Sequence, residues 1–446
     1  MKSIIISSNC SGGGKTTFTL GLMKALIKKG LKVQGYKVGP DYIDTAFHKE
    51  VTGILSRNLD TFLMGEEGVK ESYFKGIGEV GIIEGVMGLY DGIGVSSKAS
   101  TFDISRTLDD MPIVLVLSPK GQSVTLCAEI NGLKEYKKAN IVGVVLNSVS
   151  EKYYKLLKYA IEQNCNIKVF GYIPKEEKIK LSSRHLGLIQ SIEVDNLKEK
   201  LDICGDLIAK YVNLDELLEC MKELKNSHIN KDNVKIEERM FLKNKRLKIG
   251  VALDQAFSFY YKDNLELLED IGEVIYFSPI RDKSLPDNLD FLYIGGGYPE
   301  VFKEDLEKNL SMRESIKKAL DDGLRCYAEC GGLMYLTEGI DGFKMVGFFD
   351  GKSEMTKLLK RFGYCKVKID KKYFGKEFEI NAHEFHKSEV ELKEHQIYEV
   401  EKNQYDGEKI VWECGYLKNN TLAAYAHVNF LGNIKFLDVL INGEFF

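Results

Sequence analysis

The sequence predicts an α/β protein of two domains, each a doubly wound and mostly parallel sheet. At 446 residues the chain is longer than one hydrophobic core usually serves, which favours two domains of ordinary size. Short apolar runs alternate with stretches of helical spacing, and this alternation starts afresh at Lys248. Such runs are typical of strands covered by helices on both faces. We expect domains over residues 1–225 and 246–446, joined by a linker over the polar segment 226–245.

Composition narrows the class of protein. A hydrophobic content of 44% and a charged content of 29% are ordinary for a soluble globular chain. The net charge of −4, without a dense Lys/Arg run, argues against a nucleic-acid partner. Nine cysteines without a Cys-x-x-Cys pair suggest neither a disulfide framework nor a zinc site. We find no leader-like start and no apolar stretch approaching the ~20 residues of a membrane span. A cytoplasmic protein without membrane contact is therefore expected.

The elements expected in each half follow from these runs. In the first half we expect strands at 4–6, 31–40, 80–83, 113–117, 141–147 and 169–174, and helices at 18–26, 123–133, 153–163 and 192–225. In the second half we expect strands at 248–253, 274–277 and 291–294, a helix at 264–271, and further strands ending near 330 and 427.

A glycine-rich turn lies between the first expected strand and the first expected helix. It ends in Gly-Lys-Thr-Thr, although Asn9 stands where the strict phosphate-loop pattern has glycine. Glycines let the backbone approach a phosphate, a helix N-terminus favours an anion, Lys15 supplies a cation, and the Thr16 hydroxyl can bind Mg²⁺. An ordinary strand-to-helix turn is the alternative. The residues expected to bind ATP here are Gly12, Gly13, Gly14, Lys15, Thr16 and Thr17.

Acidic residues follow two of the expected strands. Asp41 and Asp44 come just after Gly39-Pro40, and Glu84 ends an apolar strand ahead of a glycine-rich loop that contains Asp91. The carboxyl edge of a parallel sheet is where ligands bind, so these acids can hold Mg²⁺ or orient a reacting carboxylate. An Asx turn at Asp41 and a helix cap at Glu84 are the structural alternatives.

A cysteine in the second half has the surroundings of a nucleophile. Cys330 follows an expected strand and precedes two glycines, the small neighbours that a strained nucleophile elbow requires. A helix N-terminus after it can stabilise a thiolate, whereas Cys326 is expected in the core. His427 is the best candidate base, with His383 and His386 as competitors that a strand would point to opposite faces.

The motifs, in their order along the chain, closely resemble the cobyrinic acid a,c-diamide synthase family over nearly the whole sequence. The matching segments are 37–44, 84–92, 184–188, 295–300 and 329–336. The resemblance implies a dethiobiotin-synthetase-like, P-loop ATP domain followed by a class I glutamine amidotransferase domain. Four positions depart from the pattern: Ser8, Ser148, Ala382 and Asn429, the last standing where most class I amidotransferases have glutamate.

By this resemblance, ATP phosphorylates an acetate of a corrinoid, and ammonia from glutamine displaces the phosphate. Cys330 and His427 form a dyad with no third member assigned, and backbone N–H groups near Gly297 and Gly331 hold the oxyanion. Asn147 meets the adenine. Metal binding falls to Thr16, Glu84 and Asp44, and handling of the acceptor carboxylate to Asp41, Tyr42, Asp44 and Asp91. The implied cofactors are ATP and Mg²⁺, and the implied substrates are L-glutamine and a corrinoid or related tetrapyrrole.

Two alternatives stay open. The first is the same reaction on a nickel sirohydrochlorin, which shares the a and c acetates. The second is a ParA-like regulatory ATPase, which explains the first half but leaves Cys330 without a role. The oligomeric state is also open, a homodimer being one candidate.

Overall fold

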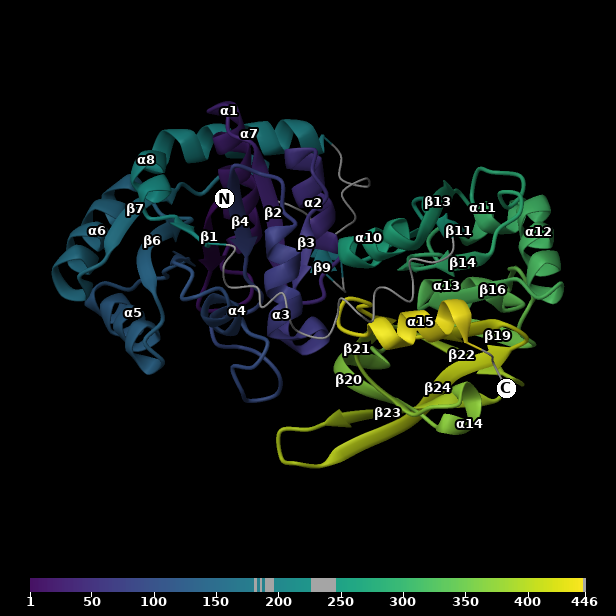
Figure 1. Ribbon diagram of the computed structural model, residues 1–446. Helices are drawn as coiled ribbons and strands as arrows, with labels where there is room; N and C mark the ends of the chain where they lie inside the picture. The colour runs from purple at the N-terminus through teal and green to yellow at the C-terminus, as the bar shows by residue number, and fades with distance from the viewer. Residues whose placement is uncertain (180–182, 185–186, 189–195, 226–245, 444–446) are drawn as a thin grey trace. The chain divides into compact units, whose positions relative to one another are not determined.

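We describe a computed structural model of the chain over residues 1–179, 183–184, 187–188, 196–225 and 246–443 (Figure 1). The chain divides into two compact units, Met1–Asn230 and Lys231–Phe446, which are described separately. The segment 226–245, expected as the linker, lies outside the described residues. No helix in the described part of the chain combines the length and the apolar character needed to cross a membrane.

The first unit is built on a parallel sheet, as expected. Its strands lie in the order β3-β2-β4-β1-β5-β6-β7, with β1 at the centre. Their bounds are β1 Lys2–Ser7, β2 Val33–Val38, β3 Arg57–Leu59, β4 Val80–Glu84, β5 Ile113–Leu117, β6 Ile141–Asn147 and β7 Lys168–Ile173. Every residue of β2, β4 and β5 is buried. Helices on both faces of the sheet account for this burial.

The helices of this unit are α1 Lys15–Lys28, α2 Ile43–Thr52, α3 Thr61–Phe74, α4 Thr101–Thr107, α5 Val124–Tyr136, α6 Glu151–Cys165, α7 Leu197–Tyr211 and α8 Leu214–Glu219. Helices α1 and α7 pack closely because glycines face the partner helix. A Cβ on Gly21 would lie 2.6 Å from Cys204 Sγ, and a Cβ on Gly205 would lie 2.7 Å from Lys24 Cγ. This contact fixes α1, and with it the turn that precedes α1.

One expected element of this unit is wrong in part. Instead of one helix over 192–225, the described residues show α7, α8 and a short strand, β10 Lys222–Glu223. Strand β10 pairs antiparallel with the start of β1, and the Met1 amino group binds Glu223 Oε1 at 3.1 Å. Val212 ends α7 in an extended conformation because it bridges to Gly171 of β7. The remaining short elements are η1 Glu177–Ile179, β8 Ser183–Arg184 and β9 Gly187–Leu188; His185 and Leu186 of the 184–188 motif lie outside the described residues.

The second unit has a mixed sheet in the order β13-β11-β14-β16-β25-β24-β23-β20-β21-β26. The pairs from β13 to β25 are parallel, as expected, and those from β25 to β26 are antiparallel. The parallel strands are β11 Leu247–Ala252, β13 Gly272–Phe277, β14 Phe291–Ile294, β16 Arg325–Glu329 and β25 Thr421–Ala424. The others are β20 Arg361–Ile369, β21 Phe378–His386, β23 Gln396–Asn403, β24 Lys409–Lys418 and β26 His427–Val428. The α/β class is thus confirmed for this unit, with an antiparallel part that the sequence analysis did not predict.

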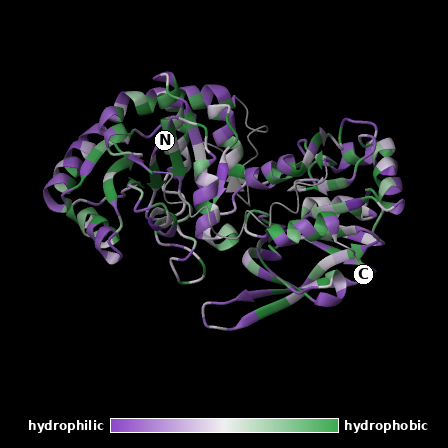
Figure 2. Ribbon diagram, viewed as in Figure 1, coloured by the Kyte–Doolittle hydropathy of each residue, from purple (hydrophilic) through white to green (hydrophobic). Residues whose placement is uncertain are grey.

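Helices and two small sheets complete the second unit. The helices are α10 Lys262–Ile271, α11 Lys303–Lys308, α12 Leu310–Asp321, α13 Gly331–Leu336, α14 Lys371–Phe374 and α15 Ile434–Asn442. The small sheets pair β12 Phe257–Phe259 with β15 Gly296–Gly297, and join β17 Gly339–Ile340, β18 Phe343–Lys344, β19 Gly351–Met355 and β22 Ser388–Leu392. Figure 2 shows apolar residues along the inner strands of each unit and polar residues on the outward turns of helices such as α6.

Candidate active sites

The turn from β1 into α1 has the backbone of a phosphate-binding loop. Gly12 and Gly14 adopt positive φ angles of 75° and 93°, which suit glycine. A Cβ on Gly13 would lie 2.1 Å from Ser8 Oγ, and one on Gly14 would lie 2.2 Å from Asn147 Nδ2. A larger residue at position 13 or 14 would therefore have to displace Ser8 Oγ or Asn147 Nδ2. In the described residues no side chain caps α1, so its first N–H groups are available to an anion.

Lys15 lies at the start of α1 and points along this loop. Its side chain is buried, and its Nζ donates to Cys10 O at 3.0 Å and to Met87 O at 2.5 Å. Burial, and secondarily the charge of Lys37, lowers the pKa of Lys15. A phosphate at the loop could replace the two carbonyl oxygens as the partner of this ammonium. Thr17 is half-buried on the same turn, and its carbonyl accepts a bond from Cys204 Sγ at 3.2 Å.

We predict that the serine at position 8 makes Gly13 intolerant of substitution. Ser8 Oγ donates to Val116 O at 2.7 Å and occupies the space that a Cβ on Gly13 would need. Gly13→Ala should lower the free energy of unfolding by about 1–3 kcal/mol through overpacking. Urea unfolding of the full chain, followed by far-UV circular dichroism, measures this change.

Ser8→Gly should remove most of that cost when it is combined with Gly13→Ala, because the two groups compete for one space. Gly132→Ala is the control, since its Cβ would meet nothing within 4 Å on α5. The control should gain up to about 1 kcal/mol from helix propensity. An equal cost of Gly13→Ala with and without the Ser8 hydroxyl would rule out this explanation.

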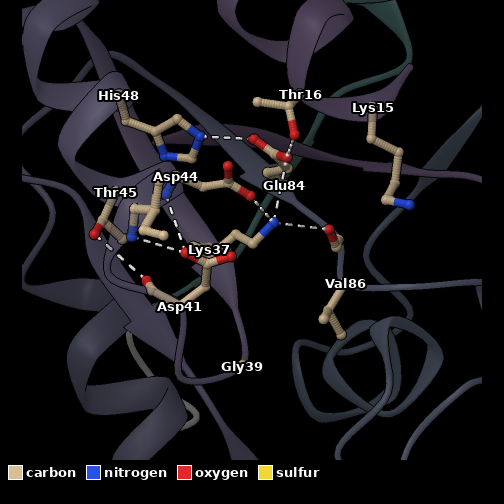
Figure 3. Close-up of polar contacts among 12 residues, drawn as sticks. Lys15, Thr16, Lys37, Gly39, Asp41, Asp44, Thr45, His48, Glu84 and Val86 are labelled. Carbon is tan, nitrogen blue, oxygen red and sulfur yellow. Dashed lines mark hydrogen bonds and ion pairs between the residues drawn. The ribbon is translucent and has the colours of Figure 1, made fainter. Parts of the chain in front are cut away.

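A buried network of charged side chains lies beside the loop, and Figure 3 shows it as sticks. Glu84, at the end of β4, accepts from Thr16 Oγ1 at 2.5 Å and is within 3.2 Å of Lys37 Nζ. Its other oxygen is 2.8 Å from His48 Nε2, and His48 Nδ1 is 3.0 Å from Ser56 Oγ. Glu84 and His48 are fully buried. Register creates part of this network, because Lys37 and Glu84 are directly opposite each other on β2 and β4.

Lys37 also binds Asp44 through a short ion pair and donates to Gly85 O at 3.3 Å. Burial opposes charge on Lys37, but Asp44 and Glu84 outweigh burial and raise the pKa of Lys37. Burial would also raise the pKa of Glu84, but the charge of Lys37 and the bond from His48 hold that pKa well below its usual range. Burial, together with the Asp41 and Glu84 carboxylates, raises the pKa of Asp44. Lys37 and Glu84 are thus charged at neutral pH.

The remaining residues expected around the acceptor carboxylate differ in burial and in hydrogen bonding. Asp41 makes the Asx turn considered above: its Oδ1 accepts from Ile43 N at 2.8 Å and from Asp44 N at 3.0 Å. Tyr42 is buried beside it. Asp91 is exposed, and its Oδ2 accepts from Gly88 N at 2.9 Å within its own loop.

Asn147, expected at the adenine, ends β6 beside the phosphate loop. Its Nδ2 lies 2.9 Å from Ser118 Oγ and 3.4 Å from Gly13 O. The structure therefore brings Asn147 to the same loop as Lys15, where its amide stabilises the loop backbone.

The residues at the loop fit a nucleotide-bound Mg²⁺. Among the described residues, no three His, Cys, Asp or Glu side chains gather as a metal site of their own. Magnesium bound to nucleotide phosphates, however, usually takes only one or two protein oxygens and keeps several waters. The Thr16 hydroxyl and the Glu84 carboxylate, already 2.5 Å apart, are oxygen donors of the required kind. Asp44 lies in the same network through Lys37.

The second unit has a sharp turn at Cys330, between β16 and α13. Cys330 adopts φ 49° and ψ −102°, a strained conformation for an L-residue, and its N–H donates to Ala424 O at 2.7 Å. Helix α13 begins directly at Gly331, whereas the sequence suggested a start after the two glycines, two residues later. The side chain of Cys330 is 7% exposed, so a reactant reaches a thiol that is largely shielded from water. Cys326 is fully buried within β16, and burial raises the pKa of its thiol, in keeping with a core position.

His427, at the start of β26, lies beside Cys330 and interacts with its thiol. Burial would lower its pKa, but the bonds to Cys330 and Glu329 outweigh burial and raise the pKa of His427 to about 10. The ring of His383 stacks on the His427 ring with centroids 4.9 Å apart. Burial, followed by the charge of His427, holds the pKa of His383 well below its usual range. An imidazolium at His427 beside a neutral His383 is the arrangement that stabilises a thiolate.

His386 is not part of this pair. Its ring stacks on Tyr425 with centroids 3.7 Å apart, and its Nδ1 lies 2.9 Å from Ser388 O. His383 instead contacts Tyr261 OH at 3.1 Å and His427. The two histidines of β21 therefore have separate partners, as their spacing on a strand predicts.

Gly297 and Gly331 lie close together beside the elbow. A Cβ on Gly331 would be 3.1 Å from Gly297 N, and one on Gly296 would be 2.5 Å from His427 Cε1. The backbone of β15 thus approaches both the start of α13 and the imidazole. Two backbone N–H groups at such a place can receive the oxygen of a carbonyl under attack.

Sequence reasoning missed three charged or titratable side chains of these sites. In the sequence, Lys37 reads as part of a strand, His48 has no motif around it, and Glu329 reads only as the first residue of the 329–336 segment. The one available signal was their position: each is polar in, or directly after, an apolar element. Their partners are distant in sequence, so the contacts come only with the fold.

Comparison with known proteins agrees with this division into two sites. Residues 4–189 match the family described as the CobQ/CobB/MinD/ParA nucleotide binding domain. Residues 248–434 match the family described as the CobB/CobQ-like glutamine amidotransferase domain.

Similar proteins cover the whole chain. The cobyrinate a,c-diamide synthase of Clostridium tetani is 59% identical over 99% of this chain and 100% of its own length. That of Clostridium acetobutylicum is also 59% identical, over 99% of this chain and all of its own length. That of Listeria monocytogenes is 42% identical over 97% of each chain. With both halves matched and full-length relatives above 40% identity, the chain belongs to the cobyrinate a,c-diamide synthase family.

Proposed function

We propose that this protein is an ATP-dependent, glutamine-hydrolysing ligase that amidates the a and c acetate carboxylates of cobyrinate. The observation that carries the proposal is the presence, in one chain, of a thiol–imidazole pair at Cys330 and His427 and of a phosphate loop at Lys15. A carboxylate resists ammonia because its leaving group would be oxide or hydroxide. The two sites supply what the reaction needs, a source of ammonia and an activated acid.

At the first site, ATP phosphorylates the carboxylate. The loop backbone and Lys15 bind the phosphates, and Lys37 supplies a second buried cation near the transferred group. Mg²⁺, bound by Thr16 and Glu84, would neutralise phosphate charge. The product is an acyl phosphate, from which ammonia displaces inorganic phosphate. We assign Asp41, Tyr42, Asp44 and Asp91 to the region that receives the acceptor carboxylate, and Asn147 to the nucleotide side of the loop.

At the second site, Cys330 attacks the side-chain amide of glutamine. His427 takes the thiol proton and gives it to the departing ammonia, and N–H groups at Gly297 and Gly331 hold the oxyanion. Water then releases glutamate from the thioester. The burial of Cys330 and His427 limits the loss of ammonia to solvent as ammonium.

Product masses test the acceptor. We expect incubation with ATP, L-glutamine and cobyrinate to give the doubly amidated product, which is lighter by about 2 mass units because two OH groups are replaced by two NH₂ groups. Nickel sirohydrochlorin, tested in a parallel incubation, is the alternative acceptor because it has the same two acetates. Turnover of the nickel compound alone would overturn the choice of cobyrinate, which rests on the names of the full-length relatives.

The ParA-like ATPase is the weaker alternative. It accounts for residues 4–189 but gives no reason for the strained Cys330 or its pairing with His427. A preparation that hydrolyses ATP and never glutamine would favour it.

A further inference from the structure

We propose that Glu329 is the positioning residue of the Cys330–His427 pair and that it takes the place of the missing third member. The proposal rests on the function proposed above and adds a role to a residue one position before the nucleophile. Glu329 is 1% exposed, and its Oε2 lies 3.5 Å from His427 Nδ1.

The surroundings of Glu329 hold its carboxylate in one orientation. Its Oε1 accepts a hydrogen bond at 3.0 Å from the N–H of Val428, the residue after His427. Its Oε2 accepts a hydrogen bond from Tyr293 OH at 2.9 Å. One oxygen is therefore tied to β26 and the other to β14. A carboxylate fixed on both sides keeps the imidazole next to it in one rotation and one tautomer.

The position that would hold this acid in most class I amidotransferases is used differently. Asn429, two residues after His427, accepts from Gly432 N at 3.2 Å through Oδ1, and its carbonyl accepts from Asn433 Nδ2 at 2.9 Å. Asn429 thereby closes the turn that leads into α15. In this chain the acid beside the imidazole is Glu329, which lies on β16 directly before the nucleophile, whereas His427 lies on β26.

The proton movements follow from this geometry. His427 keeps its Nδ1–H toward Glu329, so Nε2 is the nitrogen free to accept the thiol proton from Cys330. The resulting imidazolium lies against the Glu329 carboxylate. The groups that face His427 are Cys330, Glu329 and His383, and Tyr261 faces His383 from its other side. Of these, only Glu329 is a carboxylic acid.

Alkylation of the thiol tests the proposal in the full chain. We expect Glu329→Gln to shift the midpoint of the pH dependence of iodoacetamide labelling at Cys330 upward by about 1 pH unit or more, because the imidazolium loses its counter-charge. Glutaminase kcat should fall about 100-fold. Amidation supported by ammonium chloride should be unchanged. Glu329→Asp, which keeps the charge, should recover part of the shift.

Tyr293→Phe is the matched control. It removes the other bond to the same carboxylate oxygen and leaves the charge, so the labelling midpoint should stay where it is in the unaltered protein. If Glu329 only ties β14 to β26, both variants will lower the melting temperature and neither will move the midpoint. That result would overturn the proposal.

A measurement on the unaltered protein removes any dependence on folding of the variants. In protein labelled with ¹⁵N-histidine, with His427 assigned by its loss in His427→Gln, we expect Nδ1 to carry a proton at every pH from 6 to 9. A proton found on Nε2 alone at neutral pH would contradict the proposal. Failure of the proposed function is a different result, since the unaltered protein would then hydrolyse no glutamine at all.

Discussion

Cys330→Ala should abolish glutamine-dependent amidation and leave amidation with ammonium salts intact. The thiol is the group that forms the bond to the glutamine carbonyl, so its loss should reduce glutaminase turnover by on the order of 10⁴-fold or more. Alanine keeps a Cβ in the strained turn at φ 49°, and the change therefore removes the sulfur without altering the demand on the backbone. Product formation with 15N-labelled glutamine, and with labelled ammonium chloride, separates the two nitrogen sources by mass.

Cys326→Ala is the control for this experiment. Cys326 lies four residues earlier on β16, is fully buried and has no part in the proposed chemistry. We expect it to cost some stability through a small cavity and to leave both nitrogen sources usable. Equal loss of activity with glutamine and ammonium in Cys330→Ala would contradict separate sites for ammonia release and acid activation.

The difference between these two cysteines was predictable from the sequence, for a local reason. Cys330 is followed by Gly331 and Gly332, and a Cβ on Gly332 would lie 2.2 Å from Ile294 O. The sequence thus shows the small residues that let α13 approach β14 directly. The phosphate loop was predictable in the same way, since its glycines, Lys15 and Thr16 are adjacent in the chain.

The charged network around Glu84 was only partly predictable, because its partners meet through strand pairing. Glu84 was expected at a strand end, but Lys37 is 47 residues away and His48 is 36 residues away. Lys37 meets Glu84 because β2 and β4 pair in parallel at that register. A sheet covered on both faces gives near-continuous apolar strands, which carry no signal of register.

The antiparallel part of the second sheet does have a signal in the sequence. In β20, Cys365, Val367 and Ile369 are buried and alternate with less buried neighbours, which is the period of a half-covered strand. Lys366 and Lys368 stand between them. The alternation of apolar and polar residues is thus present in the sequence.

Lys15→Ala should abolish amidation with both nitrogen sources, the opposite pattern to Cys330→Ala. The Lys15 ammonium is held at the phosphate loop by Cys10 O and Met87 O, at the N-terminus of α1 where phosphate would bind. Losing a fixed charge that stabilises a phosphoryl transition state should lower kcat/KM for ATP by about 10³-fold. The rate of phosphate release, assayed first with glutamine and then with ammonium chloride as the nitrogen source, measures this loss.

Lys28→Ala supplies the comparison on the same helix. Lys28 ends α1, and its Nζ pairs with Asp206 at 2.6 Å on an exposed face, so its removal should change stability by less than about 1 kcal/mol and leave turnover normal. Glutaminase activity in Lys15→Ala gives a further check, since Cys330 and His427 belong to the other unit and should still release glutamate. Normal amidation by Lys15→Ala would remove the phosphate-loop assignment. Loss of amidation together with retained glutamate release would show that nucleotide activates the acid and that the thiol supplies only the nitrogen.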